Sequence, residues 1–116
     1  MKIGFARKIK HVIQKRCHNG KGAILFREIF DKKDFKSNLQ FLHETIVLPN
    51  STIGYHKHLG NEEIYYVIEG KGLMKVDGQE KIVKPGDAVI TYSGSSHGLK
   101  NIYDRDLKIL VFEAIY

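Results

Sequence analysis

The chain has 116 residues, of which 42% are hydrophobic and 28% are charged, so it suits a single globular domain with one hydrophobic core. No apolar run approaches the roughly 20 residues of a membrane-spanning helix. The basic N-terminus also lacks an apolar stretch of signal-peptide length, which favours a soluble cytoplasmic protein without membrane contact.

The net charge of +6 is concentrated near the N-terminus. Residues 1–27 contain eight of the 19 lysines and arginines and none of the 13 acidic residues. Such a segment can bind nucleic acid, and it can equally be a solvated strand edge on which lysine prevents unwanted pairing. Because no aromatic RNA-binding platform or DNA-reading helix pattern accompanies it, we do not predict nucleic-acid binding.

The first element allows two interpretations. A set of apolar residues would share one face of a helix over residues 4–15: Phe5, Ile9, Val12 and Ile13. Residues 8–15 can also form a strand that leads into the turn "NGKG" at 19–22 and then into "AILFREIF". We favour the strand.

Cys17 is the only cysteine, so no disulfide can form within the chain, as is usual in a reducing compartment. A catalytic thiol needs a base and positive charge close to its sulfur atom. His18, Lys15 and Arg16 are near Cys17 in the sequence, but this does not show that they lie near the sulfur in the folded protein. We therefore interpret Cys17 as a plain small residue and assign no role to His11 or His18.

Short runs rich in β-branched and aromatic residues follow, separated by glycine and proline. The expected strands are "LQFLHETIVL" (39–48), "EIYYVIEG" (63–70), "LMKV" (73–76), "EKIV" (80–83), "AVITY" (88–92) and "LKILVFEAIY" (107–116). Asp77–Gly78 predicts a hairpin turn, and "KPGD" at 84–87 predicts another corner. Strands at this pitch, with no long helical pattern between them, predict an antiparallel sandwich or barrel.

Two histidines and two glutamates occur close together in "GYHKHLGNEEIYYVIEG" (54–70). His56 and His58 are two residues apart, so on a strand both imidazoles point to one side, as a shared metal ion requires. Either Glu62 or Glu63 can begin the next strand facing the same way, but not both, because successive side chains alternate. If Glu63 faces inward, the outer face of that strand is apolar after its first residue and needs covering by another sheet or a partner chain.

A second motif lies downstream in "GDAVITYSGSSHGLKN" (86–101). The two stretches resemble the two conserved motifs of the cupin superfamily, of the small single-domain conserved-barrel type. The first family motif has a His-x-His pair, a glutamate, and a glycine seven positions after that glutamate. Here Gly70 stands seven positions after Glu63, so the resemblance selects Glu63 over Glu62, and it makes His97 the fourth metal ligand.

The chain departs from these motifs at two positions. Tyr92 stands where the second motif usually has proline, which puts a phenol near the mouth of the site but removes no ligand. Asn50 stands where the first motif opens on glycine, and asparagine also adopts turn conformations.

The resemblance implies an all-β fold, a double-stranded β-helix (jelly-roll) cupin barrel with an N-terminal extension of one or two strands. We expect residues 36–116 to form the barrel and residues 1–35 to pack on it or on a dimer partner. The family commonly forms homodimers, so we expect one here.

The implied ligand set is three histidines and one glutamate: His56, His58, Glu63 and His97. Three imidazoles and one carboxylate suit a divalent transition metal such as Fe, Mn, Ni, Co or Zn. A structural zinc site would more often use cysteine and close its coordination shell, whereas four ligands on an octahedral ion leave two positions open.

Three further residues are candidate catalytic groups: His43, Tyr65 and Tyr92. His43 can point into the barrel as a substrate contact, although a buried, hydrogen-bonded histidine is the interpretation we favour. We expect no second carboxylate to face inward.

Two functions therefore follow. The first is a metalloenzyme acting on a small organic molecule, dioxygenase-like or isomerase-like. The alternative is a non-catalytic cupin that binds a carbohydrate or an organic acid, in which the metal aids recognition or stability. The resemblance favours the enzyme, but fold alone does not decide function.

Overall fold

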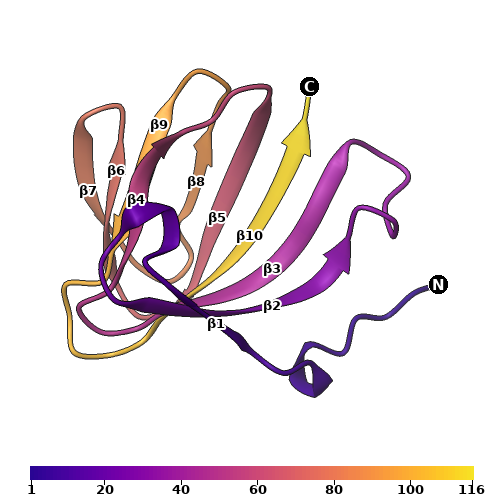
Figure 1. Ribbon diagram of the computed structural model, residues 1–116, viewed down its shortest axis with the longest axis horizontal. Coiled ribbons are helices and arrows are strands. Elements are labelled where there is room, and N and C mark those ends of the chain that lie inside the picture. Colours follow the sequence, from indigo (N-terminus) through magenta and orange to yellow (C-terminus); the bar gives the residue numbers. More distant parts are fainter.

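The computed structural model describes residues 1–116 and consists almost entirely of β-strands (Figure 1). Its elements are η1 (Ala6–Lys8), β1 (Val12–Lys15), η2 (Cys17–Asn19), β2 (Ala23–Asp31), β3 (Leu39–Val47), β4 (Thr52–Lys57), β5 (Asn61–Glu69), β6 (Gly72–Val76), β7 (Gln79–Val83), β8 (Ala88–Thr91), β9 (Ser96–Lys100) and β10 (Leu107–Ile115). Both η elements are single 3-10 turns. None of the helical segments has the length and apolar character needed to span a membrane.

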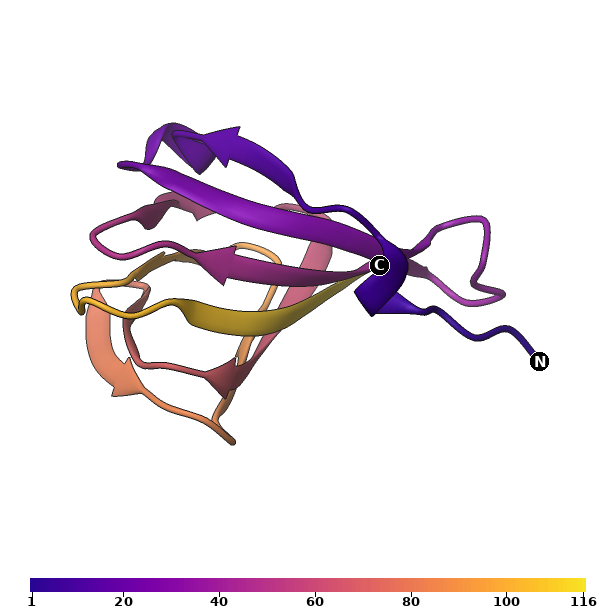
Figure 2. The same ribbon diagram turned by 90° about the horizontal axis from the view of Figure 1, so that it is seen from below.

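The strands form two antiparallel sheets that curve around a common interior (Figures 1 and 2). The larger sheet has the order β1-β2-β3-β10-β5-β8, and the smaller has the order β4-β9-β6-β7. The chain passes between the sheets several times, because β4, β6, β7 and β9 belong to one sheet and β5, β8 and β10 to the other. This arrangement confirms the predicted all-β jelly-roll barrel.

The N-terminal segment extends the larger sheet. β1 pairs with β2, and β2 pairs with β3 along most of its length. The strand that we favoured for residues 8–15 is therefore present, although it covers only Val12–Lys15. The helical alternative is wrong, because the only helical structure before residue 16 is the single turn of η1.

The core lies between the two sheets. It contains Cys17 of η2 and apolar residues from both sheets, namely Ile24, Val47, Ile53, Tyr65, Val67, Met74, Val83, Leu99, Leu107, Ile109 and Val111. Along β5, Glu63, Tyr65 and Val67 are buried, whereas Tyr66 is 42% exposed. The predicted alternation with Glu63 facing inward is thus confirmed.

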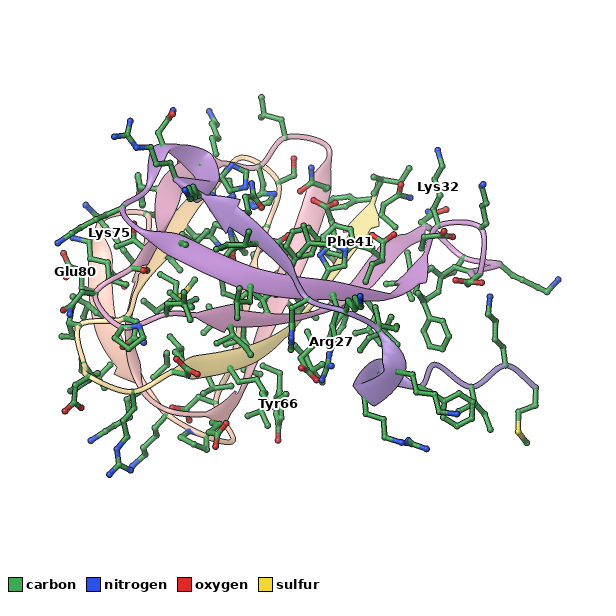
Figure 3. All side chains as sticks on the ribbon, turned by 60° about the horizontal axis from the view of Figure 1, so that its bottom comes forward. Arg27, Lys32, Phe41, Tyr66, Lys75 and Glu80 are labelled. Atoms are coloured by element: carbon green, nitrogen blue, oxygen red, sulfur yellow. The ribbon has the colours of Figure 1, made fainter.

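The outer side of the larger sheet carries the other residues of these strands. Tyr66 lies opposite Leu110 of β10, Leu110 lies opposite Glu44 of β3, and Glu44 lies opposite Arg27 of β2. Figure 3 shows Tyr66 and Arg27 on one side of this sheet and Phe41, which packs against the core, on the other. The sheet therefore separates an outer face, on which apolar and charged residues lie side by side, from the barrel interior.

Candidate metal centre

The four predicted ligands come together inside the barrel from three segments. His56 is on β4, His58 follows its end, Glu63 is on β5 and His97 is on β9. His56 and His97 are direct partners in the β4–β9 ladder. Because β5 belongs to the other sheet, Glu63 reaches the cluster from the opposite wall. One potential ligand atom from each side chain lies within 4.8 Å of those of the other three.

The donor atoms are spaced as ligands of a single ion would be. His58 Nε2 lies 3.1 Å from His56 Nε2 and 2.9 Å from His97 Nε2. Glu63 Oε1 lies 3.3 Å from His58 Nε2 and 3.2 Å from His97 Nε2. Metal–ligand bonds of about 2.0–2.2 Å at right angles place neighbouring donors about 3 Å apart. The cluster can therefore hold a metal ion.

The opposite nitrogen of each imidazole has its own partner. His56 Nδ1 donates to the carbonyl oxygen of Gly54 at 2.7 Å, and His58 Nδ1 donates to the amide oxygen of Asn61. His97 Nδ1 lies 2.8 Å from the hydroxyl of Thr91. Such partners fix the ring orientation and the tautomer of a ligand histidine. The three rings are thus oriented by the protein itself.

These hydrogen bonds also show why the cluster favours a cation. With their protons on Nδ1, neutral His56 and His58 each present a lone pair at Nε2, and the two atoms are only 3.1 Å apart. The carboxylate of Glu63 adds negative charge nearby. A proton can bridge two of these donors, but only a metal ion can be bonded by all four.

The electrostatics of the cluster agree with this interpretation. Burial raises the pKa of Glu63, but hydrogen bonds from His58 and His97 outweigh it and bring the pKa to about 2. Burial lowers the pKa of His56 to about 4, so its ring is neutral at pH 7. The hydrogen bond to Glu63 raises the pKa of His58 above its ordinary value. Glu63 and His56 are therefore in the state that metal binding requires, and at His58 a proton competes with the metal.

The three candidate catalytic residues occupy different places. Tyr65 is buried, with its hydroxyl 3.5 Å from His97 Nε2, and burial raises its pKa well above the ordinary value. His43 lies farther out, stacked on Phe41 at 4.1 Å between ring centroids and 2.7 Å from a carboxylate oxygen of Glu28. Tyr92 is 54% exposed and does not line the interior cavity. Of the three, only Tyr65 reaches the cluster.

A cavity of about 180 Å³ lies beside the cluster. It is lined by Gln14, Cys17, His18, Ile24, Phe26, Phe41, His43, Thr45, Ile53, Glu63, Tyr65 and Val111. The volume is small compared with the roughly 300–1,000 Å³ of sites for drug-sized ligands. The cavity therefore favours a compact ligand next to the cluster.

Sequence reasoning missed a second carboxylate at the site. Glu113 on β10 is the direct ladder partner of Glu63, and its Oε1 lies 3.7 Å from His58 Nδ1. Burial and then the charge of Glu63 raise the pKa of Glu113. The expectation that no second carboxylate faces inward is wrong. The alternation of Ile109, Val111 and Glu113 along the last strand was the signal that could have found it.

Other contributions to the site had weaker signals in the sequence. Thr91 precedes His97 by six residues, and Asn61 stands in the gap before Glu63, but nothing marks either as a histidine partner. Cys17 and His18 come from the N-terminal segment and line the same cavity as Glu63. Only the long-range pairing of that segment brings them there, so their sequence neighbours gave no indication.

Comparison with known proteins agrees with the fold and with the cluster. Residues 43–113 match the family described as cupin domain. An oxalate-binding protein of Thermotoga maritima is 33% identical over 91 residues, which are 78% of this chain and 75% of that protein. An uncharacterised protein of Methanocaldococcus jannaschii is 39% identical over 90 residues, 78% of this chain and 72% of its own length.

Among solved structures, the crystal structure of a "predicted oxalate decarboxylase" from Thermotoga maritima has a TM-score of 0.95 and 28% identity, and it covers 100% of both chains. A Thermus thermophilus protein has a TM-score of 0.69 and 25% identity over 79% of this chain and 83% of its own. The family match includes all four residues of the cluster. The chain belongs to the cupin domain family.

Proposed function

We propose that this cupin holds one divalent transition metal ion through His56, His58, Glu63 and His97, and that the metal-loaded protein binds a small dicarboxylate, with oxalate as the first candidate. The convergence of three oriented imidazoles and one carboxylate beside a small cavity carries the proposal. A metal with protein ligands of this kind and free positions acts as a Lewis acid that binds and polarises carboxylate oxygens.

The size of the cavity supports a small ligand, and its lining means that an anion would need the metal ion as its positive partner. Its volume of about 180 Å³ admits only a compact molecule. No lysine or arginine lines the cavity, and Glu63 contributes a negative charge. Without a metal ion, the cavity therefore has no positive charge that could bind an anion. Gln14, His18 and His43 provide polar atoms on the remaining wall. The metal ion would therefore bind the negative charge of a dicarboxylate, and Gln14, His18 and His43 would orient it by hydrogen bonds.

The names of two matches, both from Thermotoga maritima, point the same way. One is called an oxalate-binding protein and the other a predicted oxalate decarboxylase, and both match this chain over most of its length. Oxalate is the smallest dicarboxylate, and its two adjacent carboxylates can occupy neighbouring positions on one ion. Cavity size and ligand chemistry thus agree with the names.

Calorimetric titration of the metal-loaded protein with oxalate tests this proposal. We expect one oxalate per chain, no binding by metal-free protein, and much weaker binding of acetate and of the longer succinate. A His58→Ala variant should lose oxalate binding together with the metal. Metal-loaded protein that binds neither oxalate nor succinate would contradict the dicarboxylate proposal. Equally tight binding of the two would contradict the preference for the smallest dicarboxylate. Either result leaves the metal site intact.

Decarboxylation is a second candidate, which the position of Glu113 favours. Loss of one carboxylate of oxalate as CO2 leaves a carbon that takes up a proton and becomes formate. Glu113 and Tyr65 have raised pKa values because they are buried, so both hold protons more firmly beside the cluster. Formate release from oxalate, lost in Glu113→Gln but not in Glu62→Gln, would establish this reaction. Binding without formate would leave the non-catalytic alternative.

The dioxygenase-like and isomerase-like activities stay predictions from the sequence. Tyr65 is the one tyrosine that reaches the cluster, and His43 is already paired with Glu28 at the outer end of the cavity. These placements support a ligand contact for His43 more than proton transfer at the metal. Oxygen consumption by iron-loaded or manganese-loaded protein with a small organic acid would test the oxygenase.

A further inference from the structure

The turn that follows β1 has an unusual backbone. Arg16, His18 and Asn19 all have positive φ angles, of 52°, 51° and 60°. Side-chain-bearing residues adopt this left-handed conformation at a cost, and clusters of such residues persist only where surrounding structure enforces them. Strained backbone conformations of this kind are often found at functional sites. The contacts that hold the turn in place therefore indicate its function.

The turn is seated on β4, the strand that carries His56 (Figure 1). Lys21 N donates to the hydroxyl of Thr52 at 2.7 Å, and Thr52 N donates to the carbonyl of Lys21 at 2.8 Å. At Gly54 a Cβ atom would overlap with the carbonyl oxygen of His18. The backbone of the turn thus approaches β4 at a point where only glycine fits.

This seating places the ring of His18 against the ring of His56. The two imidazoles are stacked with centroids 3.6 Å apart and planes 10° from parallel. Gly54, on which the backbone of His18 packs closely, also provides the carbonyl oxygen that accepts the hydrogen bond from His56 Nδ1. The ring of His56 is therefore held at its edge by one hydrogen bond and on its face by His18, and its Nε2 is directed at the cluster.

We propose that His18 is a positioning residue of the metal centre: its ring packs on the face of His56, fixes that ligand's orientation, and makes the N-terminal turn part of the site. His18 lines the interior cavity as well, so the same turn closes one wall of the ligand site. The inference rests on the proposed function, since it concerns the residue that orients one of the four ligands. It predicts that the stacked ring matters for metal affinity.

Three substitutions at position 18 distinguish the effect of ring stacking from the effect of side-chain volume. His18→Ala removes the ring, His18→Leu fills similar space without a planar surface, and His18→Phe keeps a ring that can stack. His11→Ala is the matched control, because it removes a histidine from the same N-terminal segment without contact to the cluster. The dissociation constant for Co2+ is measured by competition with a chelator, and the visible spectrum of bound Co2+ reports the ligand geometry.

We expect His18→Ala and His18→Leu to weaken Co2+ binding about tenfold, as loss of a partner that orients a metal ligand does. We expect His18→Phe and His11→Ala to stay within about threefold of the parent and to keep the parent's Co2+ spectrum. Equal affinity of the Leu and Phe variants, or unchanged affinity of His18→Ala, would overturn the positioning role while the metal site stands. A folded parent that binds no metal would overturn the proposed function and this inference together.

Discussion

His56 and His97 face each other as ladder partners of β4 and β9, although the strands are far apart in the sequence. The hydrogen bonds of the smaller sheet therefore set the separation of these two ligands, and the rings need no rearrangement to share an ion. His58 joins them from the connection that follows β4, and Glu63 joins them from β5 of the larger sheet. The barrel thus orients its donors without help from a bound metal, which is the basis of the predictions below.

Thr91→Val tests whether the partner of a ligand histidine tunes the metal. The substitution preserves shape but leaves the buried Nδ1 of His97 without its hydroxyl partner. We expect metal affinity to fall about 10- to 100-fold and stability to fall by about 1–3 kcal/mol. Thr45→Val, which alters another buried threonine of the cavity wall, is the control. Equal affinities in the two variants would show that Thr91 does not orient His97.

Metal affinity is expected to depend on pH through His58. Its pKa is raised above the ordinary 6.5 by Glu63, so protons occupy this nitrogen and oppose metal binding as the pH falls through that raised value. Glu63 stays ionised down to about pH 2 and His56 stays neutral down to about pH 4, so neither adds to the loss near neutrality. The dissociation constant measured between pH 8 and 5 should rise steadily. A flat profile would contradict a raised pKa of His58.

Gly70→Ala tests the glycine that ends the first motif. Gly70 has φ +82°, and a Cβ there would overlap with the carbonyl oxygen of Asp106. Gly78 has the same φ with nothing within 4 Å of the Cβ position. The left-handed conformation alone costs about 1–2 kcal/mol, so Gly78→Ala should lose about that amount. Urea unfolding should show a larger loss for Gly70→Ala, and equal losses would rule out the clash.

A homodimer is expected to cover the outer face of the larger sheet. Apolar residues lie in register across three strands there, with Phe112 opposite Ile64 and Ile64 opposite Ile90. Tyr66 is 42% and Ile90 38% exposed, which is unusual for neighbouring apolar residues on one sheet face. Light scattering should find a dimer for the parent and a monomer for Tyr66→Lys. A parent that is monomeric at micromolar concentration would contradict this expectation.

The sequence predicted the barrel and the four clustered residues, partly from local patterns and partly from the family resemblance. Alternation required that only one of Glu62 and Glu63 face inward, and the family resemblance selected Glu63, which is buried. The positive-φ pair Asp77–Gly78 closes the hairpin that was expected there. The resemblance at His97 then supplied a ligand that no local spacing could connect to His56. Strand alternation, turn residues and the family resemblance were together sufficient to predict the barrel and the four clustered residues.

The rest of the site depends on pairings that one sequence does not reveal. His18 reaches the cluster only because the turn after β1 is seated on β4, and Glu113 does so because β10 lies between β3 and β5. The helix considered for residues 4–15 failed for a similar reason. Pairing with β2 over Val12–Lys15 determines the structure of that segment more strongly than its helical periodicity does.

The central claim is that four side chains hold one metal ion, and metal content measures it most directly. Mass spectrometry on untagged protein, beside the variant His58→Ala, avoids metal carried by a histidine tag. His58 is the decisive position because its Nε2 lies within 3.3 Å of a donor atom from each of the other three ligands. We expect close to one transition metal ion per chain in the parent and almost none in the variant. A folded parent that contains no metal and takes up none when it is added would contradict the account.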